Sequence, residues 1–232
     1  MSVSDVLSKY TRMKEGEREK FDRLARLLIE KNAMMNLTAI TDEAGVALLH
    51  IYDSLALADL PLFDGGGSVI DVGCGGGFPS LPLAIRRSDC RVTANDATLK
   101  KLDFVASAAN ETGCSNLTTL NGRAEELGAG NERESFDFAV ARGVARLNVL
   151  CEWCLPLVKK GGYFIAMKGE KGEEEAEEAA NAISVLGGKL VDIIKYNVPE
   201  FDYVHTLVVI KKTSFTPGVY PRANGKIKKK PL

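Results

Sequence analysis

The stretch that decides the fold is Ser68-Val-Ile-Asp-Val-Gly-Cys-Gly-Gly-Gly-Phe-Pro-Ser80. An apolar strand runs directly into a turn with four glycines, and Pro79 suits the first turn of a helix that follows. Glycine has no side chain, so a ligand can lie directly against the main chain of such a turn. The stretch therefore predicts a loop that binds a nucleotide-containing cofactor between a strand and a helix.

The spacing of the glycines distinguishes between two candidate cofactors. The dinucleotide fingerprint needs a third glycine five residues after the first, and Phe78 occupies that position. A phenylalanine followed by a proline would crowd a pyrophosphate at the helix N-terminus. The pattern Asp71-x-Gly73-x-Gly75-x-Gly77 instead resembles the first motif of methyltransferases that use S-adenosylmethionine, which has no phosphate. We therefore expect S-adenosylmethionine ahead of NAD, and a tight turn without a ligand is the remaining alternative.

Length and composition indicate a globular protein. At 232 residues, with 45% hydrophobic and 26% charged residues, the chain can bury a full core, and we expect one globular domain with an appendage. No apolar run approaches the ~20 residues that a membrane-spanning helix needs, and the first residues lack the features of a signal peptide. We therefore expect a cytoplasmic monomer with no membrane partner.

The five cysteines are an odd number scattered along the chain, which favours a reducing compartment over a disulfide framework. Cys151 and Cys154 have the spacing of a redox pair or of half a zinc site. A zinc site needs further ligands, however, and His50 and His205 are isolated in the sequence. We therefore expect two ordinary helix residues and no metal site.

Charge is distributed unevenly along the chain although the net charge is only -1. Six glutamates lie between Glu170 and Glu178, and no acidic residue follows Asp202. A basic C-terminal segment is typical of proteins that bind a phosphate backbone, but it can also serve only solubility. The residues that we expect to bind RNA in this segment are Arg222, Lys226, Lys228, Lys229 and Lys230.

Hydrophobic periodicity divides the chain into three parts. We predict a helical cap over 1–64, a cofactor-binding domain over 65–212 and a basic tail over 213–232. Short apolar runs alternate with helical patterns in the second part, as in a parallel sheet covered on both faces. The predicted strands are 69–72, 91–95, 117–120, 136–141, 163–167, 190–196 and 205–211. Because no crossover helix fits between the last two runs, we expect them to pair antiparallel. This seven-stranded α/β arrangement resembles the class I, Rossmann-like methyltransferase fold.

Ligands collect at the carboxyl ends of the central strands of such a sheet, so the residues just after each strand are candidates. Asp71 lies at the entrance of the glycine loop, where a carboxylate can fix the turn or meet the ligand's amino group. Asp96 ends the second strand, where an acid can accept bonds from both ribose hydroxyls, although Asn95 is an alternative. Asp96 can equally cap the next helix.

Two further positions follow the third and fourth strands. Ala124 and Glu125 lie where a backbone and a carboxylate can reach the adenine, although Glu125 is also suited to the first turn of a helix. Arg142 directly follows an apolar strand, and its guanidinium suits a carboxylate or an RNA phosphate. Together with Arg123 and Arg146 it can form a basic rim.

Six stretches in order along the chain resemble one known family, that of glucose-inhibited division protein B, the bacterial 16S ribosomal RNA guanine-N7 methyltransferases G (RsmG). The resemblance implies S-adenosylmethionine contacts at Gly73, Phe78, Ala124, Glu125 and Arg142. It also implies a target guanine in the 530 loop of 16S rRNA, in the small ribosomal subunit or an assembly intermediate. The matching stretches are Asn36-Leu-Thr-Ala-Ile40, His50-Ile-Tyr-Asp-Ser-Leu55, Asp71 to Ile85, Ala141-Arg-Gly-Val-Ala145, Lys168-Gly169 and Tyr220-Pro-Arg222 to Lys230-Pro-Leu232.

Guanine N7 carries an in-plane lone pair and no proton, so its methylation needs no general base. No Asn or Asp precedes a proline, which excludes the motif that methylates exocyclic amines, and no Pro-Cys pair is present. We therefore expect catalysis by positioning, an effect worth ~7 to 11 kcal/mol, with Arg123 and Arg142 ordering the RNA. The alternatives are a methyltransferase of a small molecule or protein, and a non-catalytic ribosome-assembly factor that binds RNA. An NAD-dependent oxidoreductase is disfavoured by Phe78.

Overall fold

The computed structural model describes residues 1–202 and 204–232. Its centre is a seven-stranded sheet with the strand order β3-β2-β1-β4-β5-β7-β6. Neighbouring strands are parallel, except that β7 is antiparallel to both β5 and β6. The strands are β1 (Gly67–Val72), β2 (Cys90–Asp96), β3 (Leu117–Asn121), β4 (Phe136–Arg142), β5 (Val158–Lys168), β6 (Gly188–Asn197) and β7 (Val204–Lys212). The predicted α/β fold with its antiparallel last strands is confirmed.

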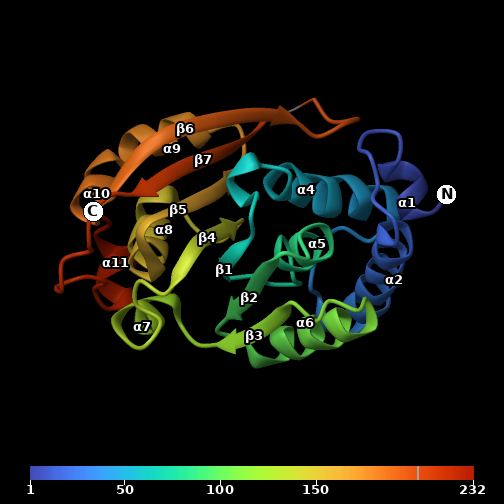
Figure 1. Ribbon diagram of the computed structural model, residues 1–232, viewed down its shortest axis with the longest axis horizontal. Coiled ribbons are helices and arrows are strands. Elements are labelled where there is room, and N and C mark those ends of the chain that lie inside the picture. The colour runs from blue at the N-terminus through green and yellow to red at the C-terminus, as the bar shows by residue number, and fades with distance from the viewer. Residues whose placement is uncertain (203) are drawn as a thin grey trace.

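Helices cover both faces of this sheet (Figure 1). One group consists of α1 (Val3–Leu7), α2 (Glu17–Met35), α3 (Glu43–Gly45), a π-helical segment (Val46–Tyr52), α4 (Asp53–Ala58), α5 (Ser80–Arg86) and α6 (Leu99–Glu111). The other consists of α7 (Ala124–Ala129), α8 (Leu147–Cys154), α9 (Gly172–Glu178), α10 (Ala180–Val185) and α11 (Asn224–Lys229). Short 3-10 turns lie at Pro61–Phe63 and Leu155–Leu157.

Alternation along the strands gives each face its own core. Val69 and Val140 belong to a hydrophobic cluster that also contains the cap, whereas Ile70 and Ala139 belong to the cluster beneath α8 and α10. Successive strand residues point to opposite faces, so both faces are apolar, as in a sheet buried between two helical layers. The cap therefore shares one continuous core with the sheet.

Three details differ from the sequence prediction. The fifth strand begins at Val158, five residues before the predicted start, and its pairing with β4 shifts register near Phe136. The segment 173–186, expected to form one acidic helix, contributes to two helices, α9 and α10, because Ala179 between them has φ -84° and ψ 0°. Pro79 lies immediately before α5 instead of in its first turn.

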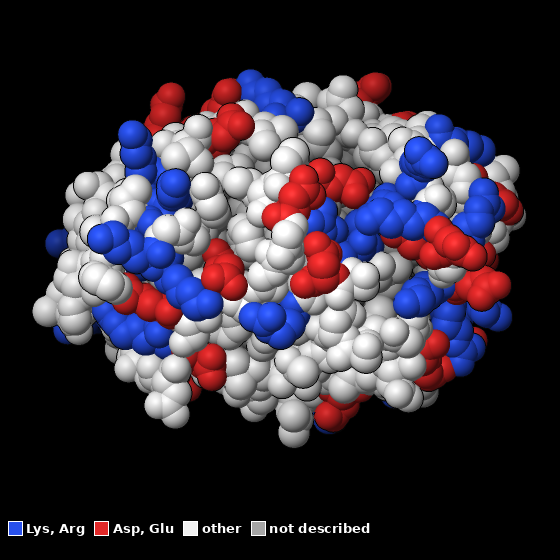
Figure 2. All heavy atoms as spheres, in the orientation of Figure 1, with Lys and Arg blue, Asp and Glu red and all other residues white. Residues whose placement is uncertain are grey.

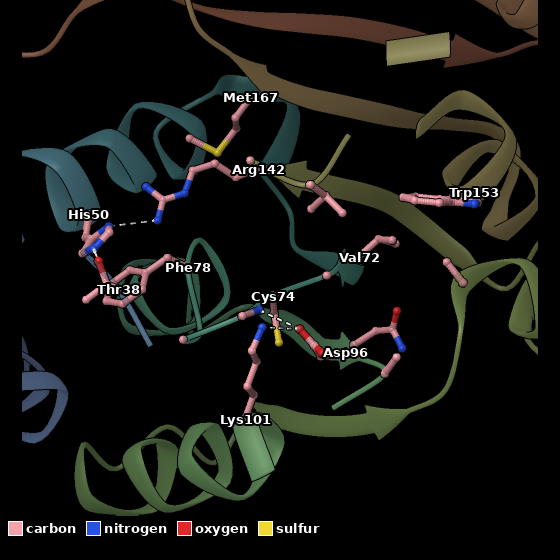
Figure 3. Close-up of a pocket in the computed structure, with 18 of the residues that line it drawn as sticks. Thr38, His50, Val72, Cys74, Phe78, Asp96, Lys101, Arg142, Trp153 and Met167 are labelled. Atoms are coloured by element: carbon pink, nitrogen blue, oxygen red, sulfur yellow. Dashed lines mark hydrogen bonds and ion pairs between the residues drawn. The ribbon is translucent and has the colours of Figure 1, made fainter. Parts of the chain in front are cut away.

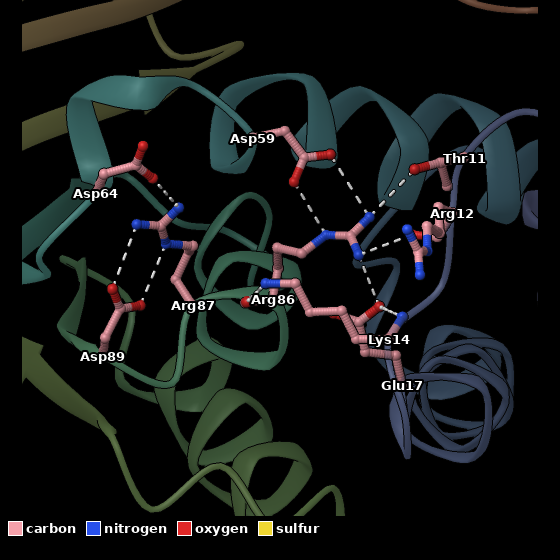
Figure 4. Close-up of polar contacts among 9 residues, drawn as sticks. All are labelled: Thr11, Arg12, Lys14, Glu17, Asp59, Asp64, Arg86, Arg87 and Asp89. Atoms are coloured by element: carbon pink, nitrogen blue, oxygen red, sulfur yellow. Dashed lines mark hydrogen bonds and ion pairs between the residues drawn. The ribbon is translucent and has the colours of Figure 1, made fainter.

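One arginine joins the cap to the sheet domain (Figure 4). The side chain of Arg86, at the end of α5, is buried and donates to Glu17 at 2.7 Å and to the carbonyl of Arg12 at 3.1 Å. Its Nε lies 3.1 Å from Asp59. Lys14 donates in return to the Arg86 carbonyl at 3.0 Å. The cap is therefore held by buried polar contacts as well as by its share of the core.

The C-terminal segment 213–232 packs against the sheet domain. Arg133 donates to the carbonyls of Thr216 at 2.6 Å and Tyr220 at 2.8 Å. Arg222 binds the buried carboxylate of Glu152 on α8 through two nitrogens, at 2.6 and 2.9 Å. This segment is thus an ordered part of the domain surface. Across 1–202 and 204–232, none of the helices combines the length and the apolar character that crossing a membrane requires.

Candidate functional site

A cavity of about 870 Å³ lies at the carboxyl ends of β1 to β5, where the sheet topology predicts a ligand. Figure 3 shows His50, Phe78 and Arg142 at one end, Trp153 at the other, and Val72, Cys74 and Asp96 between them. The cap contributes residues from α2, from the loop after it and from the π-helical segment. The cavity is therefore enclosed by the cap on one side and by the strand ends on the other.

The glycine loop forms the floor of this cavity. The backbone N–H groups of Gly73 and Cys74 both donate to the carbonyl of Asn95 at 2.9 Å, which holds the loop against the end of β2. Gly73 has φ +75°, and a Cβ atom there would lie 2.9 Å from Val144. Because this conformation and spacing suit only glycine, the main chain stays exposed to a ligand. Gly75 also lines the cavity.

Gly77 and Asp71 lie on the packing side of the same loop. A side chain at Gly77 would collide with Leu81 of α5, and the residue does not line the cavity. Asp71 is fully buried and accepts from the Ser80 backbone N–H at 3.0 Å and from the Ser80 hydroxyl. Burial raises the pKa of Asp71 to about 6. Asp71 was expected either to fix the turn or to meet the ligand's amino group, and this geometry favours fixing the turn. Gly77 and Asp71 therefore both act on the shape of the loop.

Asp96 lines the cavity and also shapes its wall. One carboxylate oxygen accepts from the Gly75 N–H at 3.1 Å and the other from the Thr98 N–H at 2.8 Å, just before α6. The Nζ atom of Lys101 lies 3.9 Å away. Asn95 also lines the cavity, but its amide donates to the carbonyls of Leu120 and Gly122, both at 3.0 Å. Asp96 therefore joins the glycine loop to the residue before α6 while it lines the cavity.

Arg142 is held in place at the other end of the cavity. It donates to the Asp53 carboxylate at 2.7 Å, to the Leu49 carbonyl at 3.0 Å and to His50 Nδ1 at 3.2 Å. Its guanidinium lies 5.6 Å from the ring centroid of Phe78. An arginine has five N–H donors, and three of those of Arg142 are used among the residues that the structure describes, which leaves two for a ligand.

His50 is a neutral side chain at this end. Burial, and next the charge of Arg142, lower the pKa of His50 to about 4. Since Nδ1 accepts from Arg142, the proton lies on Nε2, which donates to the Thr38 hydroxyl at 2.7 Å. The ring stacks on Phe78 with a centroid distance of 4.7 Å. His50 therefore joins Thr38 of the cap to Arg142 of β4 and forms part of the cavity wall.

A buried carboxylate that sequence reasoning missed organises this end. Asp53 accepts from the Tyr196 hydroxyl at 2.6 Å and His205 Nδ1 at 2.7 Å, in addition to Arg142. These bonds keep the pKa of Asp53 below its usual value although burial opposes this. Asp53 thus ties the cap to β4, β6 and β7. It stands in the stretch His50 to Leu55, but no spacing rule connects it with residues so distant in sequence.

The remaining candidates follow β3 and β4. Ala124 and Glu125 are buried in the first turn of α7 and line the cavity. Arg123 lines it as well and is exposed. Arg146 is also exposed, but it pairs with Glu178 and does not line the cavity. Of the three arginines of the predicted basic rim, Arg123 and Arg142 therefore line the cavity and Arg146 does not.

Several lining residues escaped sequence reasoning. Glu175 of the acidic stretch caps α8 by accepting from the Leu147 N–H at 2.7 Å, and it pairs with Lys168 at 2.7 Å. Its side chain is thus only partly exposed and forms a contact that joins α9 to α8 and β5. Trp153, Asn224 and Lys228 also line the cavity, from α8 and α11. Only their contacts in the folded chain reveal them.

Cys151 and Cys154 are free thiols buried in α8. Burial raises the pKa of both thiols above the ordinary value, so they stay protonated and unreactive. They are ordinary helix residues, as predicted.

Comparison with known proteins adds the family. Residues 17–201 match the family model GidB, described as rRNA small subunit methyltransferase G. The chain belongs to the rRNA small subunit methyltransferase G family. Methyltransferase G of Staphylococcus saprophyticus is 44% identical over 220 residues, which cover 95% of this chain and 92% of that protein. Methyltransferase G of Staphylococcus aureus strain Newman is 46% identical over 218 residues, which cover 94% of this chain and 91% of that protein.

Solved structures place the methyltransferase G chain in a wider fold class. An O-methyltransferase from Bacillus cereus, solved in complex with SAH, superposes with a TM-score of 0.60 at 17% identity and covers 90% of this chain and 97% of its own. A SAM-dependent methyltransferase from Aquifex aeolicus gives a TM-score of 0.57 at 18% identity, and the match covers 75% of this chain and 96% of that protein's chain. These likenesses show the fold, the class I methyltransferase fold that the glycine loop predicts.

Proposed function

We propose that this methyltransferase transfers the methyl group of S-adenosylmethionine to N7 of one guanine in the 530 loop of 16S rRNA. The observation that carries the proposal is the cavity at the strand ends, where the glycine loop, Asp96 and Arg142 meet in a chain of the methyltransferase G family. The proposed substrate places the enzyme in the cytoplasm, where we expect it to act as a monomer.

The cavity residues fit this cofactor. The Gly73 and Gly75 backbone can lie against the ligand, and Asp96 stands where ribose hydroxyls would donate. Ala124 and Glu125 border the adenine in this arrangement, and Phe78 borders the methyl group. The two spare donors of Arg142 suit the carboxylate of the methionine moiety or an RNA phosphate. When bound, S-adenosylmethionine supplies a methyl group activated by a sulfonium.

The geometry at the Phe78 end agrees with catalysis by positioning. His50 is neutral with Nδ1 occupied by Arg142, and Asp53 already accepts three side-chain bonds. Neither group is placed to remove a proton, and guanine N7 has none to lose. The chain's contribution is to hold the acceptor at near-attack distance.

RNA affinity is proposed to come from the C-terminal side. Figure 2 shows Lys and Arg side chains gathered along the side where Figure 1 shows α7, α11 and the C-terminus, with acidic side chains between them. Lys226, Lys229 and Lys230 are exposed there. Arg222 contributes less directly, because its guanidinium already binds Glu152. Such phosphate contacts provide affinity without sequence specificity.

The test uses purified protein, methyl-labelled S-adenosylmethionine and 30S subunits that lack the modification, with naked 16S rRNA in parallel. Label on N7 of a single guanine in the 530 loop is the expected result. The variant Gly73→Val is the matched control and should give no label, because its side chain enters the cofactor loop beside Val144. Label on another atom, on a protein or on a small molecule, or none despite cofactor binding, contradicts the proposal and favours the alternatives.

A further inference from the structure

The C-terminal helix α11 closes the end of the cavity opposite Arg142. Asn224 and Lys228 of this helix line the cavity together with Trp153 of α8. Ile227, between them, is fully buried in the same hydrophobic cluster as Ala124 and Trp153. The Lys228 ammonium lies 5.5 Å from the Trp153 ring centroid, a cation–π distance. The segment expected to be a basic tail thus forms part of the cavity wall.

The anchoring of this segment supports a fixed position for α11. Glu152 is completely buried, and its two oxygens receive the backbone N–H of Arg222 at 2.8 Å and the guanidinium at 2.6 Å. These bonds come two residues before α11 begins. Trp153 follows Glu152 in α8, so the residue that holds Arg222 and the residue that lines the cavity lie in the same helical turn.

Two buried polar atoms at this end have no hydrogen-bond partner among the described residues. They are the indole N–H of Trp153, a donor, and the side-chain oxygen of Asn224, an acceptor. A buried polar atom left without a partner is energetically unfavourable, so such atoms usually have a ligand or water to bind. Adenine carries ring-nitrogen acceptors and an amino donor on its edge, and its flat face suits contact with an indole.

The two ends of the cavity differ in chemistry. The Phe78 end offers spare cationic donors of Arg142, which suit a charged amino-acid moiety or a phosphate. The opposite end offers a large flat ring, a donor and an acceptor beside the small side chain of Ala124. Asp96, which suits the ribose, lies between the two ends (Figure 3).

We propose that Trp153 and Asn224 bind the adenine of the cofactor, so that the C-terminal helix is an integral part of the cofactor site. The proposal rests on the proposed function, because it needs S-adenosylmethionine in this cavity. It also separates the lysines of α11 into two classes. Lys228 stabilises the cofactor wall, whereas Lys226 and Lys229 remain available to RNA.

The first experiment uses Trp153 as its own reporter, since it is the single tryptophan of the chain. Its fluorescence should change when 5′-methylthioadenosine is added, because this compound carries the adenine and ribose without the amino acid. L-methionine should leave the emission unchanged at the same concentration. Emission unaffected by 5′-methylthioadenosine and by S-adenosylhomocysteine would contradict the proposal.

The second experiment measures S-adenosylhomocysteine affinity by calorimetry. Trp153→Phe and Asn224→Ala should each weaken binding roughly three- to tenfold, the effect of one net hydrogen bond. Lys226→Ala is the matched control on α11, exposed and outside the cavity lining, and should not change the affinity. Asn224 is only partly buried, so its variant tests the proposal even where the tryptophan variant folds poorly.

The outcomes separate the two proposals. If Trp153→Phe and Asn224→Ala both bind S-adenosylhomocysteine as tightly as the unmodified chain, these residues do not bind the adenine. The proposed function is then left intact. Failure of the unmodified chain to bind S-adenosylhomocysteine overturns both. If Lys226→Ala weakens S-adenosylhomocysteine binding as much as the other two variants, the division of the α11 lysines into a cofactor class and an RNA class is wrong.

Discussion

At the scale of single residues, His50 gives the protein a specific pH dependence. Its pKa is about 4 in the folded chain because of burial and Arg142, against an ordinary value of 6.5. Between these values the unfolded chain binds more protons than the folded chain, so the free energy of unfolding rises with pH. The contribution of His50 to the free energy of unfolding is complete above pH 6.5 and is lost as the pH falls towards 4. The free energy of unfolding falls by up to about 1.4 kcal/mol per pH unit in this range.

Urea unfolding of the unmodified chain and of His50→Gln, across this pH range, measures the effect. The variant should show a shallower rise of the free energy of unfolding with pH, because glutamine does not titrate. Contributions from carboxylates are common to both proteins and cancel in the comparison. Identical slopes in the two proteins would show that His50 titrates alike in both states.

Single residues were predictable where a general rule fixes their place. Asp96 and Arg142 end parallel strands, and strand ends meet at one edge of the sheet, so both line the cavity. Asp71 belongs to the motif, but a motif does not say which way a side chain points, and this one points into the protein. Asp53 and Asn224 were missed because folding brings them from the cap and the C-terminal segment to a cavity whose other residues are distant in sequence.

At the scale of elements, the Arg222–Glu152 pair determines how firmly the segment before α11 is held. Glu152 is fully buried, so removing its partner leaves an uncompensated buried charge. We expect Arg222→Leu to lower the free energy of unfolding by about 3 kcal/mol. Adding Glu152→Gln should restore a large part of this loss, since the buried charge is removed. Urea unfolding of the single and double variants measures both, and a loss of only about 0.5 kcal/mol would be that of a surface pair.

The helices and strands were largely predictable because apolar periodicity marks them. The seven predicted strands match β1 to β7 with differences at their ends, and the short connection before β7 correctly predicted antiparallel pairing. Packing of the C-terminal segment was not predictable. It depends on contacts such as the burial of Ile227, the Arg222–Glu152 pair and the binding of backbone carbonyls by Arg133, and none of these leaves a pattern in the sequence.

At the scale of the whole molecule, RNA affinity and cofactor affinity should respond to different substitutions. Replacing Lys226, Lys229 and Lys230 by Ala removes three exposed charges. We expect weaker binding to 16S rRNA and a salt dependence whose logarithmic slope falls by about two to three, since each phosphate contact contributes roughly 0.7 to 0.9. Filter binding at several salt concentrations measures the slope. A parallel loss of S-adenosylhomocysteine affinity would show that these side chains also support the cavity.

The hydrogen bonds of Asp53 have a consequence for synthesis of the protein. Its carboxylate lies 152 residues before one partner, His205, and two of its three side-chain partners lie on β6 and β7. A chain emerging from the ribosome presents Asp53 long before those partners exist. The Arg142 end of the cavity is therefore assembled only after β7 has been synthesised, so a chain that stops short of β7 carries the glycine loop without this end of the cavity.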